Sequence, residues 1–455
     1  MENKQKIKNF FSNLKKQIVE LKSNRVFLIC CLLTALYFAS GFFKWIEISV
    51  SVVALIFMAT LSLQQSFCIF MFLHSFTLSH IGYDSCFMVT LIGYCIILLV
   101  KYLIGVKKKH YQVYKPILIA LACFYAITSL ISVGKSLYMG AFLYYTYLPL
   151  AYLLFAMRKD FNIAQGMNYM FGGLMTSCAF ALFSIIVPFF QYNVMPGNRF
   201  RAFFNNTNYL YMRTLFVISY YMYRNLSNKL SNLKFITILA ICTLITFATL
   251  SKTGIVILCL LIGIYLILFL KQDFKKRIKY VGIFGLILLG ICLICHNYLS
   301  LIFNRFVEAF NSKNFIRSLL TGRDEIWTLY FNAIFKSPWT ALFGNGLLTE
   351  QVFVANQYGP TETHNFYIFL LYRFGIVGTI AFGYVVYLFI KYLAKDKPKF
   401  VAYLPLIYIL LESLCDNTFK CYNFTYFIFA IMILFMSCND KIKHTQTEQI
   451  EEKKN

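Results

Sequence analysis

Long apolar segments alternate with short polar segments along nearly the whole chain. The apolar runs recur from about residue 26 to residue 437, and most of the loops between them contain Lys or Arg. A helix needs about 20 apolar residues to cross a bilayer. This pattern predicts an all-α, polytopic membrane protein with about 12 to 14 transmembrane helices.

The predicted spans form three groups along the chain. They lie near residues 26–43, 47–62, 65–80, 85–105, 116–133, 137–157 and 167–190, then 208–223, 235–250, 254–270 and 280–297, and finally 364–391, 400–417 and 421–437. The stretch 47–80 could instead be a shorter re-entrant pair, because Gln64 and Gln65 interrupt it and neither half reaches full length.

One long polar interval, residues 297–363, interrupts this pattern. Transmembrane helices are predicted before it, within 26–296, and after it, within 364–437. A basic tail (1–25) precedes the spans and a polar tail (438–455) follows them. We expect both tails to be cytoplasmic and the long interval to be one large extracytoplasmic loop that carries the catalytic chemistry.

The charge balance supports this topology. The chain has 43 Lys and Arg against 18 Asp and Glu, a formal net charge of +25. The excess lies in the N-terminal tail and in short loops such as Lys107–Lys109 and Lys275–Arg277, as the positive-inside rule requires of cytoplasmic segments. Nucleic-acid binding is therefore not expected. The 14 cysteines fall almost wholly within apolar runs and imply no disulfide framework.

The first candidate for chemistry is Arg323, in the long polar interval. Thr321 can cap a helix on which Arg323, Trp327 and Tyr330 follow at i, i+4 and i+7, so the three share one face. A cation in the first turn opposes the helix dipole unless it meets an anion, and arginine suits bidentate phosphate contact. The flat ring of Trp327 suits a sugar face. The alternative for Arg323 is a solvated loop arginine.

The second candidate is His364, at the start of a predicted span. The positive end of a helix disfavours the imidazolium form and leaves a neutral ring that can accept a proton, as a general base must. The alternative is that Thr363, His364 and Asn365 only cap the helix and mark its boundary.

Further cations are predicted on the same outer side. Arg199 and Arg201 precede Asn205, Arg213 lies just inside the next span, and Lys252 lies in a tight connection between two spans. Together they could hold a diphosphate.

Arg373 lies within a predicted span, where an isolated charge is costly, so it should face the protein interior. It could contact an anionic lipid headgroup, or it could form a buried ion pair with Glu412 or Asp416.

No cofactor or metal is expected. Cys292-Leu293-Ile294-Cys295-His296 matches the pattern for c-type haem attachment, but it is embedded in an apolar helix without an obvious second axial ligand, so packing cysteines are the preferred explanation. The chain has no Asp-x-Asp pair, no His-Glu-x-x-His and no glycine-rich phosphate loop after a strand, which disfavours metal-dependent or nucleotide-driven chemistry.

Several short motifs, in this order, resemble the O-antigen ligase and polymerase family. The motifs are Ser251-Lys252-Thr253-Gly254, Gly322-Arg323 with Trp327, Pro338, Gly344-x-Gly346, His364-Asn365, Gly375 and Gly378. The resemblance covers about residues 199–378. Lys252 stands where the family often has arginine, and lysine keeps the charge but lacks the planar, bidentate fork.

The resemblance implies an inverting, metal-independent glycosyltransferase in the bacterial plasma membrane. Such enzymes take a glycan from undecaprenyl diphosphate on the outer side, and by this resemblance Arg323 would bind the diphosphate while His364 activates the acceptor hydroxyl. We expect a polymerase of lipid-linked repeat units that makes capsular or other surface polysaccharide. The alternatives are a ligase acting on a lipid, wall or protein acceptor, a lipid-linked oligosaccharide flippase, and a noncatalytic assembly subunit. The implied partners are the undecaprenyl-diphosphate-linked oligosaccharide and the bilayer, with a chain-length regulator and a flippase as candidates.

Overall fold

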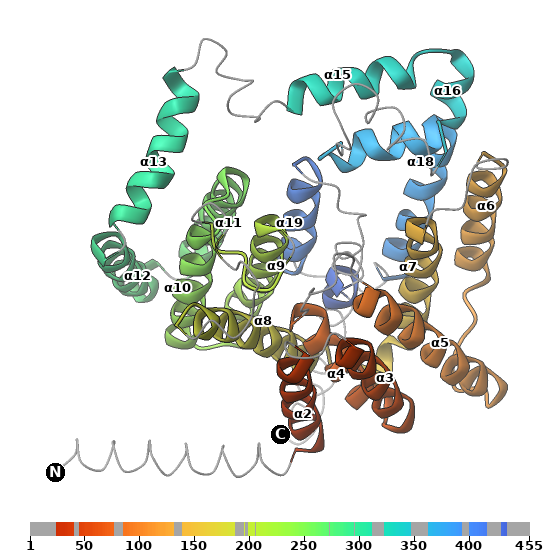
Figure 1. Ribbon diagram of the computed structural model, residues 1–455, viewed down its shortest axis with the longest axis horizontal. Coiled ribbons are helices and arrows are strands. Elements are labelled where there is room, and N and C mark those ends of the chain that lie inside the picture. The colour runs from red at the N-terminus through yellow and green to blue at the C-terminus, as the bar shows by residue number, and fades with distance from the viewer. Residues whose placement is uncertain are drawn as a thin grey trace, which may run out of the picture. The chain divides into compact units, whose positions relative to one another are not determined.

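The computed structural model consists mainly of helices joined by turns and loops in the parts of the chain that it describes (Figure 1). These are residues 24–40, 45–76, 85–131, 139–186, 195, 199–204, 206–272, 274–294, 296–311, 323–346, 363–393, 400–415 and 429–434. No strand occurs in these ranges, so the all-α prediction is confirmed. The chain divides into two compact units, residues 1–97 with 159–194 and residues 98–158 with 195–455.

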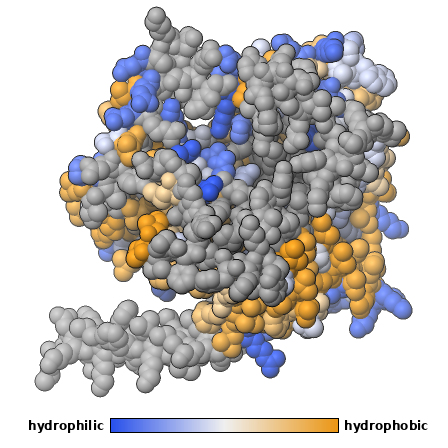
Figure 2. Space-filling model, viewed as in Figure 1, coloured by the Kyte–Doolittle hydropathy of each residue, from blue (hydrophilic) through white to orange (hydrophobic). Residues whose placement is uncertain are grey.

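The helices carry the surface expected of membrane spans. Four of the described helices are long and apolar enough to cross a bilayer: Val89–Lys107, Ile163–Ile186, Lys252–Gln272 and Phe366–Tyr392. Shorter apolar helices accompany them, and large side chains such as Leu130, Ile186 and Leu286 are exposed. Apolar side chains gather on parts of the described surface in Figure 2. An all-α, polytopic membrane protein is thus confirmed, and the number of spans stays a prediction.

The first unit is built around a short buried helix. Its helices are α2 (Arg25–Ser40), α3 (Trp45–Thr60), α4 (Leu63–Phe76), α8 (Ile163–Ile186) and the first part of α5 (Ser85–Lys107). Glycine allows α4 and α8 to approach closely, since a Cβ at Gly173 would lie 2.3 Å from the Phe72 carbonyl oxygen. The chain is interrupted between α3 and α4, just before Gln64 and Gln65, where the sequence predicts a break. The side chain of Gln64 forms hydrogen bonds with the backbone N–H and carbonyl of Asn162 in the same unit.

The second unit holds most of the candidate site. Its helices are α6 (Lys115–Ile131), α7 (Met139–Ala156), α9 (Thr207–Leu226), α10 (Asn232–Ala248), α11 (Lys252–Gln272), α12 (Phe274–Ile294), α13 (His296–Asn311), α15 (Arg323–Ile334), α16 (Pro338–Phe343), α18 (Phe366–Leu393) and α19 (Leu404–Ser413), with a short 3₁₀ turn at Phe400–Tyr403. Another 3₁₀ turn, Arg158–Asp160, contains the point in the sequence where the second unit gives way to the first. Helix α9 is buried along almost its whole length and packs against α10, α11 and α19.

The long polar interval contains helices of its own. Helix α13 begins two residues after α12 ends and was not predicted. The helix predicted to carry Arg323, Trp327 and Tyr330 is α15, which ends at Ile334. Ser337 and Pro338 open α16, whose first turn is capped because Ser337 and Thr340 exchange side-chain to backbone hydrogen bonds of 3.1 Å.

Helix α18 is not the continuous span predicted for 364–391. Gly375 has φ 62° and ψ −170°, which breaks the helix after Arg373 and Phe374. In Figure 1 the segment before the break runs alongside α15, and the segment after it turns sharply away. Arg373 therefore lies beside a break in the backbone and not in the middle of a straight span.

Some residues singled out from the sequence lie outside the described part of the chain. They include Asn205, Cys295, Thr321, Gly322 and Asp416. The predicted cap of α15 by Thr321 and the pairing of Arg373 with Asp416 therefore stay predictions.

Candidate functional site

The site is organised around the C-terminal end of α19. The Tyr211 hydroxyl donates to Glu412 Oε1 at 2.9 Å, Asn365 Nδ2 donates to the Leu414 carbonyl at 3.0 Å, and Arg323 Nη1 donates to the Cys415 carbonyl. The last carbonyls of a helix have no partner within the helix and form the negative end of its dipole. An amide and a guanidinium group therefore stabilise this end of α19, which brings α9, α15 and α18 to one place.

Helix α15 lies against the first segment of α18. Trp327 Nε1 donates to the Thr363 carbonyl at 2.8 Å, and the rings of Tyr330 and Tyr372 meet edge to face, with their centroids 4.8 Å apart. The side chains of Arg323, Trp327 and Tyr330 all face α18 and α19, so the shared face predicted from their spacing is confirmed.

His364 lies between two fixed neighbours. Thr363 is fully buried, and Asn365 caps α18 because its Oδ1 accepts the backbone N–H groups of Tyr367 and Ile368, each at 3.0 Å. His364 itself has φ 47°, a left-handed conformation that few residues with side chains adopt. The capping role predicted for this segment is thus observed for Asn365. The half-buried His364 is positioned by its two fixed neighbours, Thr363 and Asn365.

A glycine turn supports the break in α18. The backbone N–H groups of Asn345 and Gly346 donate to the carbonyls of Tyr372 and Arg373, at 2.8 and 3.0 Å. Arg373 is only 7% exposed, and its guanidinium lies 4.4 Å from the centroid of the Phe369 ring. The predicted interior position of Arg373 is confirmed, and its ion pair with Glu412 stays a prediction.

The loop 199–204 brings further cations to the end of α10. Arg199 Nε donates to the Thr249 carbonyl at 3.0 Å, and Phe200 N donates to the Ala248 carbonyl at 2.8 Å. Arg213 is 1% exposed, donates to the carbonyl of Tyr209 at 2.9 Å, and lies 4.4 Å from the centroid of the ring of Phe204 in this loop. This burial gives Arg213 a clear part in holding the loop in place. Arg201 is half-buried in the same loop.

Lys252 opens α11 next to this loop. The Ser251 hydroxyl accepts the N–H of Gly254 at 3.3 Å, and a Cβ at Gly254 would lie 2.8 Å from the Tyr211 ring. The start of α11 is therefore packed on the start of α9, and Tyr211 in turn bonds to Glu412 of α19. The loop cations and the Arg323–His364 group thus share one end of the helices in the second unit.

Part of this framework could not be found by searching for reactive residue types. The Leu414 and Cys415 carbonyls are backbone groups, and Glu412 was considered only as a partner of Arg373. Tyr211 carried one weak signal, a hydroxyl within a membrane helix that needs a partner when buried. Within the described ranges, no three His, Cys, Asp or Glu side chains come together as a metal site would require.

The fold and the site define a polytopic, all-α membrane protein with arginine, lysine and histidine gathered at one end of its helices. Residues 237–383 match the family model of O-antigen ligase, so the resemblance to the O-antigen ligase and polymerase family is confirmed over this part of the chain. The matched range includes Lys252, Arg323, His364 and Arg373 but not the loop 199–204. No curated protein and no solved structure matched the chain. The family implies a glycan-transfer function at a membrane.

Proposed function

We propose that the protein is an inverting glycosyltransferase that polymerises undecaprenyl-diphosphate-linked oligosaccharide repeat units into capsular or other surface polysaccharide. The observation that carries the proposal is the anchoring of Arg323 and of the His364 segment at one place, the C-terminal end of α19. Two groups that act on one glycosyl diphosphate need such a common support, because a small displacement of either group lowers the rate of transfer by a large factor.

In the proposed reaction, His364 is the general base. The acceptor hydroxyl of one lipid-linked unit attacks the anomeric carbon of the sugar on another carrier, and the hydroxyl proton passes to His364. The bond between the anomeric carbon and the diphosphate oxygen breaks, and the diphosphate leaves with the electron pair. Arg323, Lys252 and Arg201 stabilise the charge that develops on it, the role that fixed cations play in phosphate chemistry. We expect no metal ion to be required.

Arg323 has the donors for this role. A guanidinium carries five N–H donors, and among the described residues Arg323 uses one of its terminal nitrogens on the Cys415 carbonyl. The side chain is half-exposed, so its remaining donors can reach a ligand. We propose that the α19 bond fixes one nitrogen while the others bind a phosphate oxygen pair.

The distribution of charge supports an outer position for this site. At the opposite ends of the same helices lie Lys229, Lys271, Arg277 and Lys391, together with other basic side chains. By the positive-inside rule these ends face the cytoplasm. We therefore propose that the site faces outward from the bacterial inner membrane and that both termini are cytoplasmic.

The test is reconstitution. Purified protein in liposomes is incubated with lipid-linked repeat units, and the products are separated by length; we expect a ladder still attached to the carrier lipid. His364→Asn keeps a residue that tolerates a left-handed backbone but removes the base, and Arg323→Ala removes the cation. Each substitution should lower the rate at which the ladder of products forms by about a hundredfold or more. Matched controls are His296→Asn and Lys336→Ala, which change exposed residues away from α19.

The outcomes separate the competing functions. Transfer of one finished glycan to another acceptor, without lengthening, would indicate a ligase. Movement of lipid-linked units across the bilayer without any new glycosidic bond would indicate a flippase. Full activity in both site variants would contradict the proposed site, and wild-type activity in the controls is needed for the comparison to count.

A further inference from the structure

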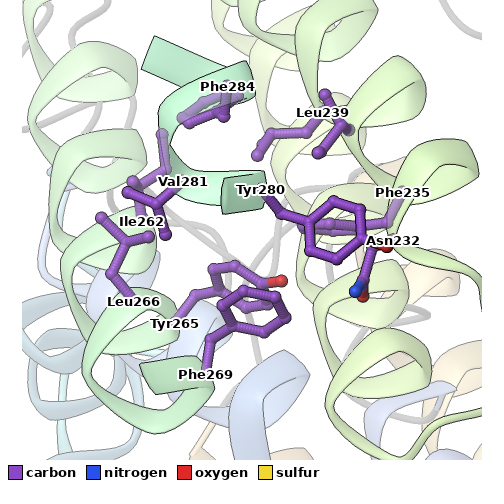
Figure 3. Close-up of a pocket in the computed structure, with 11 residues that line it drawn as sticks. Asn232, Phe235, Leu239, Ile262, Tyr265, Leu266, Phe269, Tyr280, Val281 and Phe284 are labelled. Carbon is purple, nitrogen blue, oxygen red and sulfur yellow. The ribbon is translucent and has the colours of Figure 1, made fainter. Parts of the chain in front are cut away.

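A cavity lies in the same unit as the candidate site, between α10, α11 and α12 (Figure 3). Its lining is apolar and aromatic apart from the polar tips of Asn232, Tyr265 and Tyr280. None of its lining residues belongs to the candidate glycan-transfer site. We call it the α10–α12 pocket.

The pocket runs lengthwise along the helices. Asn232, Phe269 and Tyr280 lie at or near the ends of α10, α11 and α12 that are opposite the candidate site, while Leu239 and Phe284 lie further along α10 and α12. From Asn232 to Leu239 the rise along α10 is about 10 Å. An apolar lining of this length is suited to contact with one acyl chain of a lipid.

The mouth of the pocket is strongly basic. The guanidinium of Arg277 lies 4.4 Å from the centroid of the Phe269 ring, and its Nη2 donates to Asn228 Oδ1 at 2.9 Å. Its Nη1 is buried and makes no hydrogen bond with the described residues. Further basic residues at this end are Lys229, Lys234, Lys271, Lys275 and Lys279. In the sequence, Asp273 is the only acidic residue between Asp160 and Glu308.

We propose that the α10–α12 pocket binds an anionic phospholipid of the bilayer leaflet at this end of the helices. The headgroup phosphate pairs with Arg277 and the neighbouring lysines, and one acyl chain occupies the space between Phe235, Leu239 and Phe284. Charge complementarity selects the anionic headgroup, because basic clusters beside a membrane attract anionic lipids. The apolar length of the pocket selects a lipid over a free phosphate. This inference does not depend on the proposed glycan transfer.

The test uses the full-length protein in nanodiscs that contain phosphatidylglycerol with a photoreactive acyl chain. Labelled peptides are mapped by mass spectrometry, and we expect label on α10, α11 and α12. Arg277→Gln should reduce this labelling about fivefold, the effect of losing one cation near the surface. The matched control is Lys391→Gln, which removes an exposed cation from the last turn of α18 and should leave the label unchanged.

A second pair of variants tests the apolar part. Val281→Trp fills the pocket from α12 and should displace the label, while Ile283→Trp adds the same ring at a 38% exposed position of the same helix and should not. Excess phosphatidylglycerol should compete with the probe, and phosphatidylcholine or glycerol phosphate should not. Labelling at the wild-type level in Arg277→Gln and Val281→Trp would overturn the proposal, and so would competition by glycerol phosphate as strong as that by phosphatidylglycerol. Circular dichroism of each variant establishes that it is folded.

Discussion

Gly344 and Gly375 lie with their backbones in contact, and both have left-handed φ angles, 77° and 62°. A Cβ at Gly375 would lie 2.4 Å from the Leu342 carbonyl oxygen and 2.5 Å from Gly344 N, and a Cβ at Gly344 would lie 2.4 Å from the Arg373 carbonyl oxygen. Only two glycines can approach in this way. Their contact joins the end of α16 to the break in α18 and so sets the direction in which the segment carrying Asn365 leaves that joint.

Gly375→Ala should therefore destabilise the protein markedly. The new methyl group would meet backbone atoms that cannot rotate away, at a φ of 62° that alanine rarely adopts. The cost should be about 2 kcal/mol or more. Thermal unfolding in detergent measures it as a fall in Tm. Gly383→Ala, in the same helix, is the matched control, because a Cβ at Gly383 would have no neighbouring atom within 4 Å. This substitution should raise stability slightly. Equal Tm values for the two variants would contradict the role of the glycine contact.

Asn365 has two functions that can be separated. Its Oδ1 caps α18, and its Nδ2 donates to the Leu414 carbonyl at 3.0 Å. Asn365→Asp keeps the capping oxygen and loses the donor, so we expect a small loss of stability and a large loss of transfer activity. Asn365→Ala loses both, with an additional cost of about 1 kcal/mol for the cap. The measurements are Tm and the rate of product formation for both variants. Equal stability of Asp and Ala variants would show that the cap contributes nothing.

The local pattern of the sequence was sufficient to predict the helices and the shared face of α15. Apolar runs of membrane length specify helices because a single segment can pair its own backbone N–H and C=O groups within lipid only as a helix. Arg323, Trp327 and Tyr330 follow the helical period, so their common face requires only that α15 be a helix. The capping segment at the start of α18 was likewise visible, since Asn365 precedes a long apolar run.

Other features depended on contacts that composition does not encode. The break at Gly375 was missed because the apolar run continues through it and glycine is tolerated within membrane helices, so only the partner turn at Gly344 explains it. Helix α13 is amphipathic, so its polar positions interrupt the apolar run and do not distinguish it from a polar loop. The carbonyls of Leu414 and Cys415 carry no residue-type signal, and the residues that bind them lie far away in the sequence.

Trp327→Phe tests the link between α15 and the His364 segment. Phenylalanine keeps an aromatic ring against Tyr330 and Tyr372 but cannot donate to the Thr363 carbonyl. We expect the free energy of unfolding to fall by about 1 kcal/mol. We also expect kcat to fall in the folded variant, because the backbone before His364 would be less well fixed. Trp339→Phe, at a 70% exposed position, is the control. A variant that loses stability but retains kcat would separate Trp327 from the chemistry.

Arg323→Lys asks whether charge alone is enough at the end of α19. Lysine keeps the positive charge near the helix terminus, but it has a single nitrogen and cannot bond to the Cys415 carbonyl while offering a planar pair of donors to a phosphate. We expect Tm to change little, because a cation remains at the negative end of the helix dipole. The transfer rate should fall about tenfold or more, the value of about one charge-assisted hydrogen bond. Lys336→Arg, which exchanges the same two residue types at an exposed position, should keep the wild-type rate. A wild-type rate in Arg323→Lys would mean that the site needs only a positive charge at this position, and it would refute the bidentate contact.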